Sequence, residues 1–360
     1  MCALRSEKVC LALWLLVSFY ACCITAGPCN PDDRLRGAWN LTDKPVHTQP
    51  EYCPDTAAAM RADRHGAMYM CGPTHVYRDA MYAWALPIVP SNTLAHDLAA
   101  RGPLSVEFLG DSTLQQVFYA FACELERGGA LVSGAWTARG ESYARVETIQ
   151  QSNSVSVRFT FSRFLREDLP CSPTCRNKTT AETCSGCEFW DLGSLMLDKA
   201  VQSLVADARN RSTRAEAVVV GVGSWYNYHK GLYNSSLEFE RTLKELRHAF
   251  VTLERSGTRV FWYDIPHCGA YCDRFHRPEP AYEWDGIAAK NAAARRILNG
   301  SAHFLNISGA VIPRLEQDAV WPDGGPTDGM PHYCNPGPSS VPQFVAHVLL
   351  ALLQCKRTSN

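Results

Sequence analysis

The chain has 360 residues, of which 46% are hydrophobic and 20% are charged. A chain of this length and composition can bury a sizeable core, either as one large domain with additions or as two small domains. Its formal net charge of −1 provides no basic excess to attract phosphate groups, which argues against nucleic-acid binding.

The first 28 residues are typical of a targeting segment. Arg5 and Lys8 precede an apolar run, 9–24, that is long for the core of a signal peptide and short for a membrane span. Residues 24–26 loosely fit a cleavage site, whereas the unbroken apolar run fits a signal anchor with the basic residues in the cytoplasm. Both alternatives direct the remainder into the secretory pathway. We favour the anchor, which predicts a type II membrane protein, and a cleaved signal peptide predicts secretion.

Cysteines and glycosylation sequons agree with a lumenal location. Of the 16 cysteines, the even number that follows the targeting segment favours disulfides in an oxidising compartment. One group has the spacing of a structural zinc site, but we expect disulfides there and no metal; its members are Cys171, Cys175, Cys184 and Cys187. The sequons predict surface glycosylation. They lie at Asn40, Asn177, Asn210, Asn234, Asn299 and Asn306.

The rest of the chain divides into two parts. Residues 29–100 are rich in Pro, Asp, Tyr and Cys and lack sustained periodicity, which predicts an irregular, disulfide-pinned region. Within 101–360, strand and helix patterns alternate, which predicts an α/β domain with a mainly parallel sheet. The predicted strands are 105–110, 154–164, 215–225 and 258–266. The predicted helices are 112–129, 192–208, 235–257, 285–300 and 339–355.

The first of these strands ends at Gly110-Asp111-Ser112, directly before a helix. In doubly wound sheets, ligands gather at the carboxyl ends of strands, so Ser112 lies where chemistry is expected. One interpretation is that Asp111 or Ser112 only caps the helix. The other is that Ser112 is a nucleophile at the positive end of the helix, where backbone N–H groups stabilise an oxyanion.

A nucleophilic serine needs a base, and the base needs an orienting carboxylate. Asp328 and His332 lie close together in the segment WPDGGPTDGMPHYCNPG, shortly before the last predicted helix. Together with Ser112 they predict a Ser-His-Asp triad.

These residues resemble the trichome birefringence-like (PC-esterase) family of the GDSL/SGNH hydrolase superfamily. The resemblance rests on the GDS triplet, on Asp328 and His332, and on HYCNPG, with further landmarks in GAWN, EYCP, YAWALP and GVGSW. It implies an SGNH-hydrolase-like three-layer α/β/α sandwich with a disulfide-rich N-terminal extension. It also implies O-acyl transfer, commonly the acetylation of polysaccharide hydroxyls in the Golgi lumen.

The resemblance also assigns roles to the triad. Ser112 is then the nucleophile, His332 the general base and Asp328 the carboxylate that holds the imidazole. The family pattern sets the carboxylate three residues before the histidine, whereas Asp328 lies four before it, so Asp323 remains an alternative.

Other residues are candidates for auxiliary roles. Gly110, Asp111 and the side-chain amide of Asn227 are candidates around the oxyanion, although the family places its asparagine where Gly221 stands here. We expect Trp225 and Tyr226 to stack on an acceptor sugar, with core packing as the alternative. These two lie just after a predicted buried strand.

The predicted function is a lumenal O-acyltransferase that acetylates glycan or polysaccharide hydroxyls. The acyl donor, acetyl-CoA or another acetyl carrier, is a substrate, and no bound cofactor is expected. A carbohydrate or lipid esterase that uses the same triad is one alternative. The other is a catalytically inactive glycan-binding protein with the same fold.

Overall fold

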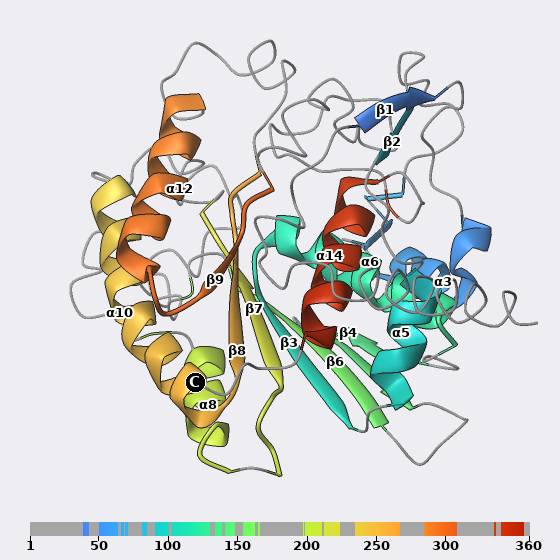
Figure 1. The fold of residues 1–360 in the computed structure, drawn as a ribbon, viewed down its shortest axis with the longest axis horizontal. Helices are drawn as coiled ribbons and strands as arrows, with labels where there is room; N and C mark the ends of the chain where they lie inside the picture. Colours follow the sequence, from blue (N-terminus) through green and yellow to red (C-terminus); the bar gives the residue numbers. More distant parts are fainter. Residues whose placement is uncertain are drawn as a thin grey trace, which may run out of the picture.

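The computed structural model of the protein contains a central sheet with helices on both of its faces (Figure 1). The described residues are 39–42, 50–63, 66–67, 69–70, 81–84, 91–100, 103–129, 134–138, 141–147, 154–162, 165, 197, 199–210, 212–223, 235–266, 284–307, 335 and 340–355.

The central sheet is mainly parallel, as predicted. Its strand order is β4-β5-β6-β3-β7-β8-β9. The last five strands in this order run parallel, whereas β4 pairs with β5, and β5 with β6, in the antiparallel sense. The strands are β3 (Leu104–Gly110), β4 (Gly134–Ala138), β5 (Glu141–Glu147), β6 (Ser154–Phe161), β7 (Ala217–Gly221), β8 (Arg259–Tyr263) and β9 (His303–Leu305).

Helices form a layer on each face of this sheet, which confirms an α/β class consistent with three layers. One layer contains α5 (Ser91–Ala100), α6 (Ser112–Arg127) and α14 (Val341–Gln354). The other contains α8 (Lys199–Asp207), α10 (Ser235–Ser256) and α12 (Trp284–Leu298) (Figure 1). Side chains of a strand alternate between the layers. Phe261 and Tyr263 of β8 therefore join the core beneath α6 and α14, and Val260 and Trp262 join the other core.

Every strand and helix predicted from residue 105 onward is present, with shifted ends. The described part of the helix predicted at 192–208 is α8, and the strand predicted at 215–225 is β7. The sequence patterns missed β4, β5 and β9. β9 is only three residues long, and β4 and β5 have few β-branched residues, so pairing with a neighbouring strand rather than local preference defines them.

Residues 29–100 were predicted to be irregular, but they contain regular elements. β1 (Trp39–Thr42) pairs antiparallel with β2 (Met81–Trp84). A short 3-10 helix, η1 (Pro50–Tyr52), precedes α3 (Pro54–Ala62), whose proline lies in the first turn, where a missing N–H is tolerated. α5 also belongs to this region and adds Ala95 and Leu98 to the core of α6 and α14.

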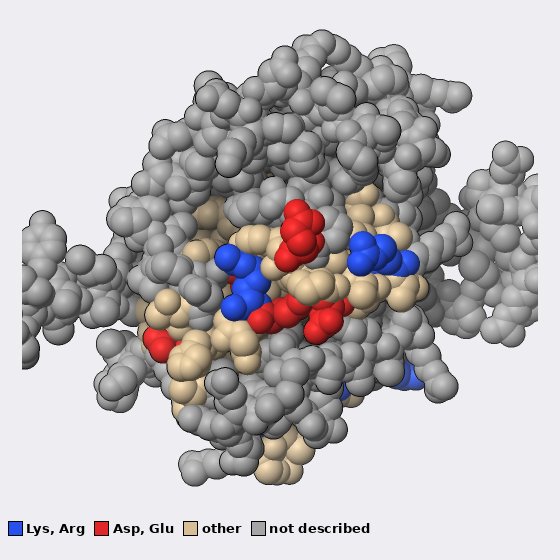
Figure 2. Space-filling view, turned by 90° about the vertical axis from the view of Figure 1, so that its right-hand side faces the viewer, with Lys and Arg blue, Asp and Glu red and all other residues tan. Residues whose placement is uncertain are grey.

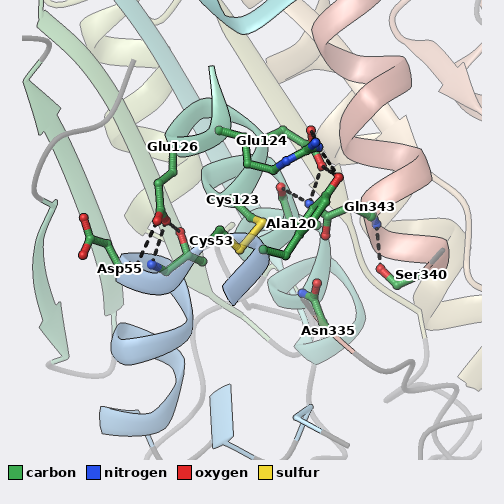
Figure 3. The surroundings of a disulfide bond; sticks show 12 residues. Cys53, Asp55, Ala120, Cys123, Glu124, Glu126, Asn335, Ser340 and Gln343 are labelled. Atoms are coloured by element: carbon green, nitrogen blue, oxygen red, sulfur yellow. Dashed lines mark hydrogen bonds and ion pairs between the residues drawn. A yellow bond between two sulfur atoms is a disulfide. The ribbon is translucent and has the colours of Figure 1, made fainter. Parts of the chain in front are cut away.

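The segment containing η1 and α3 is attached to α6 by covalent and polar contacts (Figure 3). Cys53 and Cys123 form a disulfide with a Cα–Cα distance of 5.4 Å. The carboxylate of Glu126 accepts hydrogen bonds from the backbone N–H groups of Asp55 and Thr56, both at 2.9 Å. The predicted use of cysteines in disulfides is thus confirmed for one pair. The cysteine group at 171–187 lies outside the described residues.

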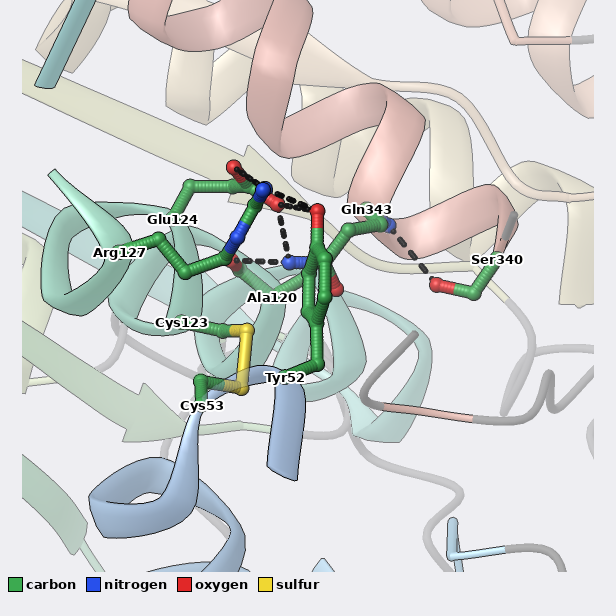
Figure 4. Close-up of polar contacts among 8 residues, drawn as sticks. All are labelled: Tyr52, Cys53, Ala120, Cys123, Glu124, Arg127, Ser340 and Gln343. Carbon is green, nitrogen blue, oxygen red and sulfur yellow. Dashed lines mark hydrogen bonds and ion pairs between the residues drawn. A yellow bond between two sulfur atoms is a disulfide. The ribbon is translucent and has the colours of Figure 1, made fainter. Parts of the chain in front are cut away.

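A buried carboxylate joins this segment to α6 and α14 (Figure 4). Glu124 accepts hydrogen bonds from the side chains of Tyr52 at 3.1 Å, Gln343 at 2.6 Å and Arg127 at 2.9 Å. The Arg127 guanidinium also lies 3.8 Å from the centre of the Tyr52 ring. Burial raises the pKa of Tyr52, and the charge of Glu124 raises it further, so the phenol remains a neutral donor.

These contacts explain why α6 is buried on nearly all sides, with every residue from Ser112 to Leu125 inaccessible or nearly so. The sheet and α14 cover one part of its surface, and η1 and α3 cover another. The helix that begins with Ser112 is therefore held rigidly.

Only some of the residues in the targeting and glycosylation predictions belong to the described part of the chain. Among the described helices, none has the length and apolarity needed to cross a membrane; residues 1–28 lie outside them. Asn210 and Asn299 are exposed, and Asn306 is half-buried. Asn40 lies in β1, and Asn177 and Asn234 lie outside the described residues.

Candidate active site

Ser112 lies at the carboxyl edge of the sheet, directly after its central strand, β3. After β3 the chain forms β4, β5 and β6 on one side of β3, and then β7 on the other side. The helix that follows β3 packs on one face, and the helix that follows β7 packs on the opposite face. The strand order thus reverses between β3 and β7, and such switch points are where doubly wound sheets bind ligands.

The strands that meet at this edge approach unusually closely. A Cβ atom on Gly110 would lie 2.0 Å from the carbonyl oxygen of Gly221 on β7. The backbone N–H of Asp111 donates to that same oxygen at 3.1 Å, and the N–H of Ser162 donates to the Gly110 carbonyl at 2.8 Å. Because β6, β3 and β7 are joined at their ends, the start of α6 has a fixed position over the sheet.

Asp111, rather than Ser112, caps α6. Its backbone is extended, and its Oδ1 atom accepts hydrogen bonds from the backbone N–H of Thr113 at 3.0 Å and from the Thr113 hydroxyl at 2.6 Å. Ser112 is the first residue of the helix and is 8% exposed. Of the two residues considered as the helix cap, Asp111 has this role, which confirms the capping interpretation for Asp111.

Gly110 and Asp111 have clear structural roles. Gly110 permits the close approach of β3 to β7, and Asp111 bonds to β7 through its N–H and to α6 through its carboxylate. Their auxiliary role around an oxyanion stays a prediction. The first N–H groups of an α-helix have no acceptor within the helix. In α6 the N–H of Thr113 donates to the Asp111 carboxylate, so it does not serve an oxyanion.

Tyr263, the last residue of β8, is a neighbour of this site that the sequence patterns did not single out. It is buried, and its ring lies against Gly221, because a Cβ on that glycine would be 3.0 Å from the Cβ and Cδ1 atoms of Tyr263. Burial raises the pKa of Tyr263, and the carboxylates of Asp111 and Asp264 raise it further. The phenol is thus neutral and near the cap of α6. The carboxyl-edge argument applied to the strand predicted at 258–266 would have found it.

Polar residues of α12 hold the chain just after β8. The side-chain amide of Asn291 accepts a hydrogen bond from the N–H of Ile265 at 2.9 Å and donates to its carbonyl at 3.0 Å. Asp264 is fully buried and forms an ion pair with Arg295. Lys290 is also buried, and burial lowers its pKa. This end of β8 is therefore fixed by paired polar groups that local patterns did not reveal.

One described residue of the C-terminal motif, Asn335, reaches α6. It is fully buried, its backbone N–H donates to the carbonyl of Tyr69 at 2.9 Å, and its side-chain amide donates to the carbonyl of Gln116 at 2.9 Å. Gln116 lies one turn after Ser112. Asn335 of the segment HYCNPG thus contacts the helix that carries the predicted nucleophile.

The remaining predicted site residues lie outside the described residues. They are Asp323, Asp328 and His332 of the predicted triad region, the predicted oxyanion residue Asn227, and the predicted sugar contacts Trp225 and Tyr226. Within the described ranges, no three His, Cys, Asp or Glu side chains are grouped as metal ligands would be.

The charges on the described surface are mixed. On the face that Figure 2 shows, acidic and basic side chains of the described residues lie next to one another. No protein-family model matches this chain, and no curated protein matches it. Arguments about function therefore depend on the residues and their geometry.

Proposed function

We propose that the chain is a lumenal O-acyltransferase of the SGNH type, similar to the trichome birefringence-like family, and that Ser112 is its nucleophile. The observation that carries this proposal is the position of Ser112. It is the first residue of α6 and lies where the strand order reverses, and the cap of the helix is Asp111. A serine there is oriented by a rigid helix and lies next to N–H groups suited to an oxyanion.

The proposed reaction has two halves. The Ser112 hydroxyl attacks the acyl carbonyl of the donor while His332 takes the hydroxyl proton, and the backbone N–H of Ser112 contributes to the stabilisation of the tetrahedral oxyanion. Collapse forms the acyl-serine ester, and His332 returns the proton to the leaving group, which is a thiol for acetyl-CoA. A glycan hydroxyl then attacks the ester and loses its proton to His332. Collapse yields the O-acetylated glycan, and the proton returns to Ser112.

Asp328 is proposed to orient His332, with Asp323 as its competitor. Chain connectivity supports the participation of this segment, because His332 is three residues before Asn335, which bonds to α6. Asp328→Asn should reduce turnover much more than Asp323→Asn, since only the orienting carboxylate selects the imidazole tautomer and stabilises the imidazolium. The reverse ranking assigns the role to Asp323.

Transfer rather than hydrolysis requires an oriented acceptor, because water is present at about 55 M and effective molarities of about 10⁵ M or more are attainable by positioning. Trp225 and Tyr226 follow β7, whose carboxyl end is part of this site, and aromatic rings suit stacking on a neutral sugar. We therefore expect Trp225→Ala to shift the products toward free acetate. Dominant hydrolysis by the unaltered protein at saturating acceptor would instead identify an esterase.

The decisive experiment treats the full chain, solubilised in detergent, with a fluorophosphonate probe and assays transfer of labelled acetyl from acetyl-CoA to a glycan panel. We expect one labelled peptide, containing Ser112, and loss of label and transfer in Ser112→Ala by a factor on the order of 10³ or more. The control is Ser301→Ala, which removes a buried hydroxyl bonded to the Leu298 carbonyl at the end of α12. Activity retained in Ser112→Ala would exclude the serine mechanism and favour a binding protein.

A further inference from the structure

Asn335 and α14 contact α6 along one row of its residues. Ser112, Gln116, Ala120 and Glu124 are spaced four apart, so they follow one another along one side of the helix. Three of these four positions accept hydrogen bonds from residues at the start of α14 or before it. Ser112 is the first residue of this row.

Two side-chain amides make these bonds in order. Gln343, in the first turn of α14, donates to the carbonyl of Ala120 at 3.2 Å and to the carboxylate of Glu124 at 2.6 Å. Asn335, eight residues earlier, donates to the carbonyl of Gln116 at 2.9 Å. Both amides are buried, and both lie along α6, with Asn335 nearer to the beginning of the helix (Figure 3).

Contacts from earlier residues of the chain lie nearer to the start of α6. As the chain is followed backward from Gln343 to Asn335, the bonded position on α6 moves one turn toward Ser112. Ser112 is a further turn, about 6 Å, from Gln116 along the helix axis. His332 precedes Asn335 by three residues, and three peptide units span at most about 11 Å. The covalent reach of the chain from Asn335 therefore includes the position of Ser112.

We propose that Asn335 is a positioning residue of the acyl-transfer site: its side-chain amide and backbone N–H hold the C-terminal segment in register on α6, so that the base three residues upstream meets Ser112. This inference rests on the proposed function. Asn335 bonds to Gln116 on α6 and to the carbonyl of Tyr69, so it is held between α6 and the turn at Tyr69.

The chemistry of the amide explains why Asn suits this position. A helix carbonyl has two lone pairs, so Gln116 can accept the Asn335 amide in addition to its bond within the helix. Asp has the shape of Asn but presents only acceptors when ionised, and it would face the Gln116 oxygen without a proton to share. Asn335→Asp therefore removes the donor with almost no change in volume, and the backbone bond to Tyr69 remains possible.

The test compares Asn335→Asp and Asn335→Ala with Gln343→Ala. Gln343 is the matched control, because it is also a buried amide that bonds to an α6 carbonyl, but that carbonyl, of Ala120, is one turn further from Ser112. Each full-length variant is assayed for acetyl transfer at varied donor concentration, and rates are expressed per Ser112 that a fluorophosphonate probe can label at completion. This normalisation removes any loss caused by unfolded protein.

We expect kcat to fall by about 30- to 100-fold in both Asn335 variants, with KM changed by less than about 3-fold, because a displaced base slows the chemical step without weakening donor binding. Gln343→Ala should lower kcat per labelled site by less than about 3-fold. The rate of probe labelling should fall in parallel with kcat in the Asn335 variants. If Asn335→Ala does not fold, Asn335→Asp supplies the same comparison.

Two results would overturn the inference alone, with Ser112→Ala inactive as expected. One is an Asn335→Asp variant with unchanged kcat, and the other is an equal loss in Gln343→Ala, which would indicate a general packing effect. Activity retained in Ser112→Ala would instead overturn the proposed function, and this inference with it. The two failures are therefore distinguishable.

Discussion

Replacing Gly110 by alanine tests whether the close approach of β3 to β7 holds the site together. The added Cβ would lie 2.0 Å from the carbonyl oxygen of Gly221 and 3.0 Å from the Cδ2 atom of Leu114. The oxygen belongs to the backbone and cannot rotate away, so the strands must separate by about 1 Å or more to reach ordinary contact.

This separation breaks a hydrogen bond as well as straining the packing. The N–H of Asp111, whose residue is 1% exposed, would lose the Gly221 oxygen, and a buried donor without an acceptor costs about 1–3 kcal/mol. Overpacking adds about 1–3 kcal/mol. We expect Gly110→Ala to lower the free energy of unfolding by about 2–6 kcal/mol and to slow probe labelling of Ser112 by at least about 10-fold.

The assay is urea unfolding followed by far-UV circular dichroism, with disulfides intact, together with the rate of fluorophosphonate labelling. Gly129→Ala is the control, because its added Cβ meets nothing within 4 Å and only its φ of 68° is unfavourable. That cost is about 1–2 kcal/mol, without an effect on labelling. If Gly110→Ala were as stable as the unaltered protein and labelled at the same rate, the close strand approach would have no role in placing Ser112.

Three further variants test other parts of the fold. Arg259→Lys removes the planar group that bonds to the last carbonyls of α14 and should cost about 2–4 kcal/mol in urea unfolding, whereas the exposed Arg296→Lys should cost less than about 0.5 kcal/mol. Burial raises the pKa of Glu107 above its ordinary value of 4.5, so ionisation of this carboxyl opposes folding. As pH rises from 4.5 through the raised pKa, the unaltered protein should therefore lose stability relative to Glu107→Gln. A difference in stability that does not change with pH would contradict this. Replacing Cys53 and Cys123 together by serine opens a loop of 70 residues and should cost about 4 kcal/mol, and a loss below about 1 kcal/mol would show that the polar contacts suffice.

Local sequence patterns were sufficient to predict most strands of the sheet and the helices that cover it. The buried strands β7 and β8 are continuous apolar runs, and α14 begins with a Ser340 cap and a proline in its first turn. Local sequence patterns did not predict β9, which has only three residues, or α3. The first-turn N–H groups of α3 donate to Glu126, which is 70 residues or more away in the chain. An element whose hydrogen bonds are completed by distant groups has no signature within its own sequence.

The sequence by itself determined that a small polar triplet ends the first strand of the α/β region and begins a helix, because strand and helix periodicities and capping preferences act within a few residues. Only the tertiary structure decided that Asp111 is the cap, that Gly221 and Tyr263 lie beside it, and that Asn335 bonds to Gln116 across 219 positions of the chain. These contacts depend on the order of strands in the sheet. That order is selected by the packing free energy of the whole core, which no short stretch of sequence contains.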